Sequence, residues 1–171
     1  MTEKTEYISR DLLLFLMSFF YIIPVAYVYI YYDNNSSISS IISEDNSKYI
    51  ILFFMILMGT ATILYEYKRD DTYSLAIISI LLVSIYILLY FPEGHILHYL
   101  FASIAFISIL LFMIRHCNRE CYQECYVLHI LLHIQMLLLL FLIINKDDNI
   151  FLYESIYLLN FAVFYFYIHS K

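Results

Sequence analysis

Six long runs of apolar residues make up most of this chain and constrain its fold more than any other feature. Each run comes close to the roughly 20 residues that an α-helix needs to cross about 30 Å of hydrocarbon. The runs cover residues 12–32, 49–65, 72–92, 96–114, 126–145 and 149–168. We therefore expect an all-α integral membrane bundle of six transmembrane helices, with residues 1–171 forming a single transmembrane domain.

The overall composition argues against two other fold classes. Of the 171 residues, 63% are hydrophobic and 14% are charged, whereas ordinary soluble domains are about 25% charged. A soluble fold of this size could not remove so much apolar surface from water. A transmembrane β-barrel would show strands of about ten residues in which polar and apolar side chains alternate. The runs here are continuous, so helices are expected.

The lengths of the connecting segments predict which helices are neighbours. Residues 93–95 and 146–148 form very short connections, so the helices that they join should be antiparallel hairpins. Gly94, which follows Pro92 closely, is a typical turn signal. The longest connection, residues 33–48, is rich in Ser and Asn, and we expect it to be irregular with at most a short surface helix.

The distribution of Lys and Arg predicts the orientation of the bundle, because cytoplasmic loops are enriched in these residues. Only Lys48 and Lys146 fall on one side of the six spans. The other side holds Lys4, Arg10, Lys68, Arg69, Arg115, Arg119 and Lys171. Both termini are therefore expected in the cytoplasm, in a plasma membrane or endomembrane. Asn34 and Asn35 begin overlapping sequons in the outer loop and are candidate glycosylation sites.

Two amide side chains lie deep within the predicted spans, where polar groups are costly. At about 1.5 Å per residue, Gln135 lies about 14 Å from the inner end of its helix and Asn160 about 16 Å from the outer end of the next helix. In a slab of about 30 Å these depths nearly coincide. We expect a structural hydrogen bond between Gln135 and Asn160 that holds the two neighbouring helices together.

Two further features of the spans are expected to serve packing. Pro24 frees a backbone carbonyl in the first helix and should kink it. Gly59 and the small residues that follow it in the second helix would let a neighbouring helix approach closely.

A group of ionisable side chains gathers at the predicted outer rim: Glu93, His95, His98 and Glu154. Two carboxylates and two imidazoles at one level could hold a metal ion or relay protons. The simpler interpretation, which we favour, is that these groups lie at the wet interface of the membrane.

A repeating pattern of cysteine and histidine follows the fourth run. It recurs every four residues, at Cys117, Cys121, Cys125, His129 and His133. Residues four apart share one face of a helix, so Cys121, Cys125 and His129 could bind zinc or copper(I), with His169 as a fourth ligand. The competing interpretation is that these cysteines, on the reducing cytoplasmic side, are free thiols or carry palmitate.

Three motifs succeed one another through the first four predicted helices. Residues 42–45 (ISED) end the outer loop, residues 91–94 (FPEG) form an outer turn, and residues 98–106 (HYLFASIAF) begin the fourth helix. In this order the motifs resemble the six-helix family that includes the damage-regulated autophagy modulators. The resemblance covers about half the chain and implies six helices with both termini inside, without indicating an enzyme. The proline-rich outer loop of that family has no counterpart here, and the last two helices do not match.

Motifs of known catalytic machinery are missing from the sequence, which has no Walker loop or nucleophile elbow. We therefore expect a non-enzymatic multi-pass membrane protein that organises lipid or partner proteins through its helix faces. One alternative is a metal-binding or metal-dependent protein that uses the cysteine and histidine pattern. Another is a small transporter or channel subunit with a path along Gln135, Asn160 and Glu154. Expected partners are the lipid bilayer and either copies of this chain or another membrane protein, not nucleic acid. No cofactor is expected, unless the pattern binds zinc or copper.

Overall fold

The computed structural model describes residues 9–30, 37–43, 48–120, 126–144 and 150–169. Of these described residues 91% are helical, and none of them forms a strand. The helices are α1 (Arg10–Ile30), α2 (Ile38–Ser43), α3 (Lys48–Lys68), α4 (Thr72–Leu88), α5 (Ile96–Glu120), α6 (Tyr126–Ile144) and α7 (Ile150–His169). The predicted all-α fold class is confirmed.

Among the described residues, five helices are long and apolar enough to cross a membrane: α1, α3, α5, α6 and α7. α4 is also apolar but has only 17 residues. The expectation of a helical bundle suited to a membrane is therefore confirmed. The count of six crossings and the side on which the termini lie stay predictions.

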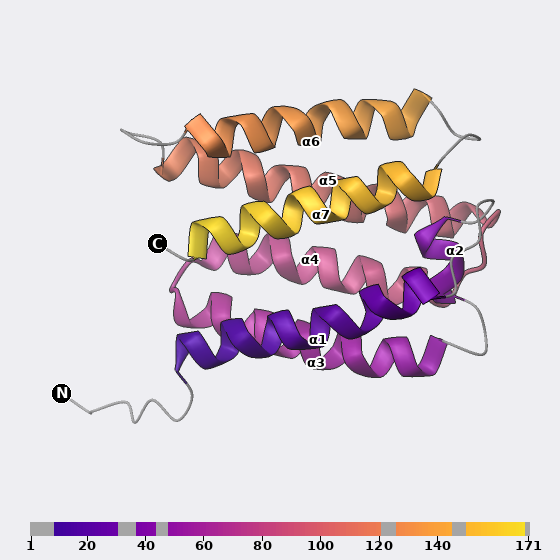
Figure 1. Ribbon diagram of the computed structural model, residues 1–171, viewed down its shortest axis with the longest axis horizontal. Helices are drawn as coiled ribbons and strands as arrows, with labels where there is room; N and C mark the ends of the chain where they lie inside the picture. Colours follow the sequence, from indigo (N-terminus) through magenta and orange to yellow (C-terminus); the bar gives the residue numbers. More distant parts are fainter. Residues whose placement is uncertain (1–8, 31–36, 44–47, 121–125, 145–149, 170–171) are drawn as a thin grey trace.

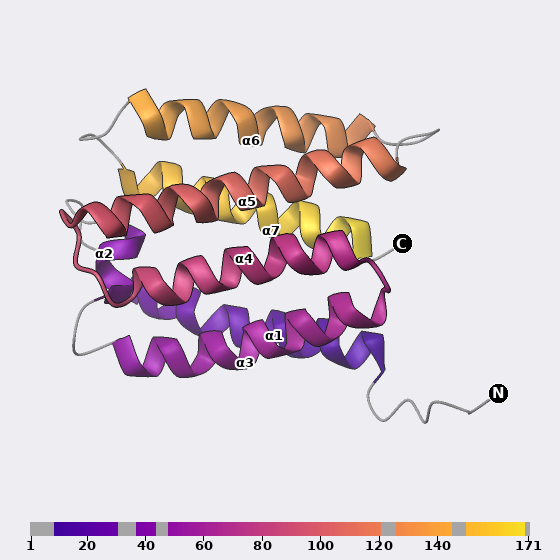
Figure 2. The same ribbon diagram turned by 180° about the vertical axis from the view of Figure 1, so that it is seen from behind.

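The long helices run side by side along one common direction (Figure 1). α1 begins and α7 ends at one end of the bundle, here called the termini end, whereas α2 lies at the opposite end, called the α2 end. Seen from behind, α4 lies between α3 and α5 (Figure 2). As the short connections predict, α4 and α5 are antiparallel neighbours, and so are α6 and α7.

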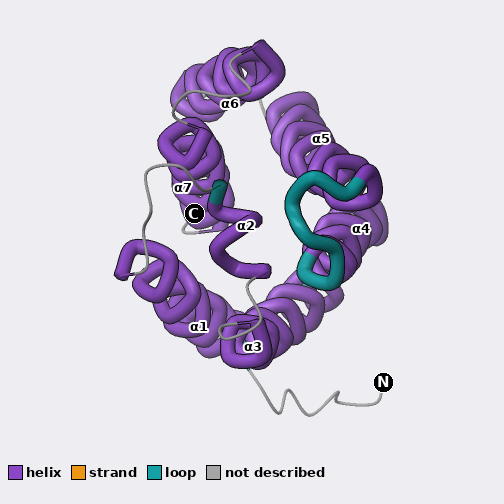
Figure 3. The backbone as a smooth tube through the Cα atoms, turned by 90° about the vertical axis from the view of Figure 1, so that its right-hand side faces the viewer, coloured by secondary structure: helices purple, strands orange, loops and turns teal. Residues whose placement is uncertain are grey.

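Five of the long helices are arranged as a ring. Figure 3 looks along the bundle from the α2 end and shows α1, α3, α4, α5 and α7 around a central space over which α2 lies. α6 packs outside this ring, against α5 and α7. α1 and α7 are neighbours in the ring but make little direct contact with each other.

Helix α4 ends earlier than its apolar run predicts. The run favours a helix over residues 72–92, but the helix ends at Leu88 and the chain turns. Pro92 has no N–H and disfavours helical geometry in the residue before it, so the end of the run leaves the helix. Gly94 then redirects the chain into α5 with a φ of 94°, which glycine adopts without a steric penalty.

Helices α3 and α5 instead extend beyond the runs over 49–65 and 96–114. α3 spans Lys48–Lys68, and α5 continues to Glu120. Hydropathy detects only the apolar part of a helix, whereas these added turns carry charged side chains that bond to neighbouring helices. The predicted bounds were therefore too short at the termini end.

The described part of the predicted outer loop, residues 33–48, is not a surface segment. Lys48 already belongs to α3, and residues 33–36 and 44–47 lie outside the described residues. Between them lies α2, which begins after the buried Ser37, whose Oγ accepts a hydrogen bond from Ser40 N at 3.0 Å. Ile41 packs against Val28 of α1 and Phe151 of α7. The short helix is therefore a plug in the ring: Ile41 is buried, and the residues on either side of it are half-buried.

The small residue Gly59 allows α3 and α4 to approach each other closely, as predicted. A Cβ at this position would overlap the hydroxyl of Tyr86, and Leu82 is the next nearest neighbour. The same hydroxyl donates a hydrogen bond to the carbonyl oxygen of Met55 at 2.9 Å. Pro24 lies inside α1, which continues to Ile30.

We expect Gly59→Ala to lower the thermal stability of the purified protein in detergent, because its methyl group displaces the Tyr86 hydroxyl. Overpacking of this kind costs about 1–3 kcal/mol. Tyr86→Phe removes the atom in the way at the cost of one hydrogen bond, about 1 kcal/mol. In the Tyr86→Phe background, Gly59→Ala should therefore add little. Equal costs of Gly59→Ala in both backgrounds would contradict the close contact.

Candidate functional site

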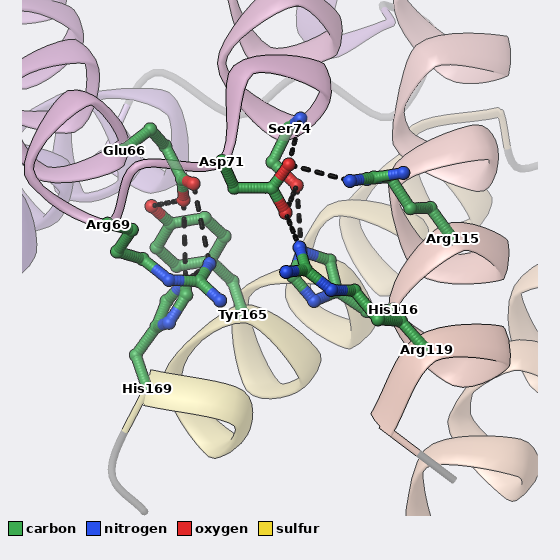
Figure 4. Close-up of polar contacts among 9 residues, drawn as sticks. All are labelled: Glu66, Arg69, Asp71, Ser74, Arg115, His116, Arg119, Tyr165 and His169. Carbon is green, nitrogen blue, oxygen red and sulfur yellow. Dashed lines mark hydrogen bonds and ion pairs between the residues drawn. The ribbon is translucent and has the colours of Figure 1, made fainter.

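A network of polar side chains connects four helices at the termini end (Figure 4). Two carboxylates form its centres: Glu66 at the end of α3 and Asp71 just before α4. Their partners come from the connection after α3, from α4, and from the ends of α5 and α7. The nine members are Glu66, Arg69, Asp71, Ser74, Arg115, His116, Arg119, Tyr165 and His169.

Asp71 caps the start of α4 and pairs with two arginines of α5. Its carboxylate accepts hydrogen bonds from Ser74 N at 3.2 Å and from Ser74 Oγ at 2.9 Å. Such a side chain satisfies backbone donors that the first helical turn leaves unpaired. Arg115 donates to the same carboxylate at 2.6 Å, and Arg119 donates to its second oxygen. One aspartate thus joins α4 to the extended end of α5.

The charges around Asp71 keep it ionised. Burial of its carboxyl by itself would raise the pKa. The hydrogen bonds from Arg115 and Ser74, together with the positive charge of Arg115, outweigh that effect and hold the pKa well below its ordinary value. Asp71 is therefore ionised at neutral pH, and two arginines share its charge.

His116 and Ser74 approach Asp71 in an order that does not suit nucleophilic catalysis. The Ser74 hydroxyl donates its one proton to Asp71, so His116 Nε2, at 3.1 Å from Ser74 Oγ, must be the donor in that contact. In a catalytic triad the histidine lies between the acid and the serine and accepts the serine proton. Here the serine lies in the middle and all three side chains are buried. The geometry of this group therefore does not match that of a catalytic triad.

Glu66 is completely buried, at 0% exposure, and joins α3 to α7. The Tyr165 hydroxyl donates to its carboxylate at 2.7 Å, and His169 Nε2 lies 3.4 Å from the same oxygen. Arg69 reaches the other oxygen at 3.4 Å. The Tyr165 and His169 rings contact each other at 4.3 Å between centroids. A buried carboxylate in this setting is compensated by three partners, as a buried charge requires.

Sequence reasoning missed this network. Arg69, Arg115 and Arg119 entered the prediction only as markers of orientation, and Glu66 fell one residue beyond the predicted end of its helix. A signal was present for Asp71, because an aspartate directly before a helix is a typical N-cap. The spacing of Arg115 and Arg119 also places both on one face of a helix.

At the α2 end, the predicted rim cluster separates into two pairs. His98 and Glu154 are buried, at 2% and 5% exposure, whereas Glu93 and His95 are exposed. The interface interpretation is therefore wrong for His98 and Glu154. Hydropathy alone could not reveal that α2 folds over them and removes both from the surface.

The two buried members of that cluster hold α2 in place. Glu154 Oε2 accepts a hydrogen bond from Ile38 N at 2.7 Å. His98 Nδ1 lies 2.9 Å from the carbonyl oxygen of Phe91, which can only accept, so this nitrogen carries the proton. The other ring nitrogen, Nε2, forms a hydrogen bond with Ser39 Oγ at 3.1 Å. The plug is thus bonded to α5 through His98 and to α7 through Glu154.

The hydrogen bond predicted between the two deep amides is present. Asn160 Nδ2 donates to Gln135 Oε1 and also lies 2.9 Å from the Leu131 carbonyl oxygen. Gln135 Nε2 donates to the Tyr157 carbonyl oxygen at 3.2 Å. Both amides are buried and their partners all belong to α6 and α7, so they join these helices rather than line a path.

The cysteine and histidine pattern is divided between helices. Cys117 is buried on α5, and its Sγ donates to the Leu128 carbonyl oxygen of α6 at 3.5 Å. Cys121 and Cys125 lie outside the described residues, as do Asn34 and Asn35. His129 is exposed on α6, as is His133, whereas His169 turns toward Glu66.

A metal site would need several of these ligands at one point. Within the described ranges, the structure contains no group of three or more His, Cys, Asp or Glu side chains placed to hold a metal ion. The structure does not bring His129 and His169 together, because one is exposed on α6 and the other is bonded to α3. The zinc or copper site predicted at Cys121, Cys125 and His129 stays a prediction, because both cysteines lie outside the described residues, whereas His169 is bonded to Glu66 instead.

Comparisons with known proteins leave the geometry as the main guide to function. The chain matches no protein-family model, no curated protein and no solved structure. The resemblance to the autophagy-modulator family stays a prediction.

We expect Asp71→Asn to lower the melting temperature in detergent, because it leaves Arg115 and Arg119 without their shared anion. Breaking a fully buried pair costs about 3–5 kcal/mol and an exposed pair at most about 1. Arg119 is 59% exposed and Arg115 27%, so a loss of about 2 kcal/mol, or about 4–8 °C, is expected. Asp70→Asn is the matched control, since it removes a neighbouring exposed charge and asparagine tolerates the φ of 59° at that position.

The loss of stability caused by Asp71→Asn should become smaller at acidic pH. Because folding lowers the Asp71 pKa, its contribution to stability is complete above the unfolded value of about 3.9 and is lost as the pH falls further. The gap between the native protein and Asp71→Asn should thus narrow below about pH 4. A gap that widens on acidification, or a larger loss from Asp70→Asn, would contradict the assigned role.

Proposed function

We infer that this chain is a non-enzymatic membrane protein with six spans, which organises lipid or partner proteins through its helix faces. One observation carries the proposal: the buried polar side chains of the ring connect helices to one another, while the outward faces of the helices are apolar. The protein would thus use its interior polar groups for its own architecture and offer hydrophobic surface to its surroundings.

The outward faces support a lipid environment. Large apolar side chains are exposed on every long helix, among them Phe15 on α1, Phe53 on α3, Val83 on α4, Leu111 on α5, Leu137 on α6 and Leu159 on α7. In water an apolar surface of this extent would lead to association. In a bilayer the same side chains contact acyl chains at no cost, which is the normal situation of transmembrane helices.

The position of α4 supports a sixth span. α3 ends at the termini end and α5 begins at the α2 end, so α4 must connect the two ends. Its 17 residues lie at the lower limit of the roughly 17–25 that cross a bilayer. If α3 and α5 cross the membrane, α4 crosses it as well.

The charges support termini on the cytoplasmic side. Lys68, Arg69, Arg115 and Arg119 all belong to the termini end, whereas Lys48 starts α3 at the α2 end. An excess of Lys and Arg marks the cytoplasmic face of membrane proteins. This orientation places the plug α2 on the outer side of the membrane.

The alternative of a transporter or channel subunit receives less support. Gln135 and Asn160 bond to each other between α6 and α7, outside the ring, and Glu154 is engaged by α2. Polar solutes need a path of hydrogen-bonding groups through the bilayer, and these three residues do not form one.

The full-length protein, reconstituted in liposomes of mixed lipids, should leave the lipid composition unchanged when it is followed by mass spectrometry. In parallel, particles extracted from its own membrane with a copolymer should retain a lipid class or one protein in a constant ratio to the chain. Protein-free liposomes and particles of an unrelated six-span protein are the controls. Time-dependent conversion of any lipid would overturn the proposed function.

A further inference from the structure

The half of the ring nearer the α2 end encloses a cavity of about 270 Å³. Residues of α1, α2, α3, α4, α5 and α7 line it, and most of them are apolar, for example Val25, Met55, Leu81, Ala105 and Leu158. The charged residues of the network at the termini end are not part of its lining. The plug α2 contributes Ile38 and Ile42 to the wall and so closes the cavity toward the α2 end.

Access to the cavity lies between α1 and α7. These two helices make little direct contact, and the lining residues Tyr29 of α1 and Leu159 of α7 are each 61% exposed. Lining residues on the opposite wall are buried, including Ile51 and Leu81. Nearer the α2 end, the aromatic rings of Tyr29 and Phe151 contact each other, with 5.9 Å between their centroids, and so connect α1 to α7. The opening therefore faces sideways, toward whatever surrounds the bundle.

The lining defines the chemistry of a ligand. None of the described residues that line it is Lys, Arg or His, and Glu154 accepts a hydrogen bond from the backbone of α2. Nothing in this lining would neutralise an anionic group, and the Glu154 carboxylate is already bonded to α2, so an uncharged ligand fits the lining best. Ser155 adds one polar feature, because its hydroxyl is buried and has no hydrogen-bond partner among the described residues. Buried hydroxyls are nearly always bonded, so this one marks a place where a ligand could supply the missing bond.

The size and the apolar lining of the cavity suit a hydrocarbon ligand. In another protein, an apolar cavity of about 150 Å³ stays free of water and binds benzene. The cavity here is larger and opens sideways, at the level of the apolar faces of α1 and α7. If the protein spans a membrane, as proposed above, lipid acyl chains would surround that opening and be the most abundant apolar groups near it.

We propose that this cavity binds the alkyl chain of an uncharged membrane lipid, which enters from the bilayer between α1 and α7. The proposal rests on the membrane location in the proposed function and names the lipid class that the helix ring would hold. The plug α2, fixed by Glu154 and His98, forms the outer wall of the site, and Ser155 faces the end of the bound chain that carries a hydroxyl or ester.

The test uses the full-length protein in nanodiscs and a long-chain fatty alcohol that carries a photoreactive diazirine in the chain. After illumination, peptide mapping should place label on lining residues such as Met55, Met58 and Leu158. Ala105→Phe fills the cavity with a ring and should lower this labelling roughly tenfold, which corresponds to about 1.4 kcal/mol of binding. Ile107→Phe is the matched control, because it adds the same ring to an exposed position of the same helix.

A second variant guards against misfolding of Ala105→Phe. Ala102→Leu adds a smaller side chain to the same wall and should lower the labelling with a native helix content and elution volume. Label confined to outward-facing residues, or lining label that neither variant reduces, would overturn the cavity as a lipid site. That failure differs from failure of the proposed function, which lipid conversion would show while the cavity could still be occupied.

Discussion

The architecture depends on one constraint: a polar group inside an apolar bundle must find its partner within the protein. A chain with this composition offers few such groups, and hydrocarbon supplies neither donors nor acceptors. Glu66, Asp71, His98, Gln135 and Glu154 are all buried, and each is bonded to a different helix or to the plug. Each buried polar group thus acts as a specific link between elements whose apolar surfaces alone would leave the arrangement loosely defined.

The links are concentrated at the two ends of the ring. At the termini end, Glu66 and Asp71 connect α3, α4, α5 and α7, and at the α2 end Glu154 and His98 hold the plug. Between these ends, the hydroxyls of Tyr86 and Tyr157 donate to the backbone carbonyls of Met55 and Phe106, and an apolar cavity opens to the side between α1 and α7. The ionisable links thus lie at the ends of the ring, and the proposed lipid site lies between them.

Local features of the sequence were sufficient to predict the fold class. They could not predict contacts between residues that are distant in the chain. Gln135 and Asn160 could be paired because a short connection makes their helices neighbours and depth then follows from the helical rise. Glu66 and Tyr165 lie far apart in the sequence, and their contact requires knowing that α3 and α7 meet in a ring. His98 and Glu154 each bond to α2. Their burial depends on this helix of six residues, which is too short for its apolar pattern to predict its position. Pro92 already indicated that α4 ends early. The prediction followed the apolar run instead and extended the helix to residue 92.

Thiol labelling of single cysteines on both sides of α4 tests the six-span bundle most directly. In a background with Ser at the three natural cysteines, Thr72→Cys and Glu93→Cys introduce exposed thiols at opposite ends of this helix. In sealed membrane vesicles with the outer face outward, an impermeant maleimide should react with Glu93→Cys at once and with Thr72→Cys only after permeabilisation. Reaction of both variants from the same side would show that α4 does not cross the membrane and would contradict the account.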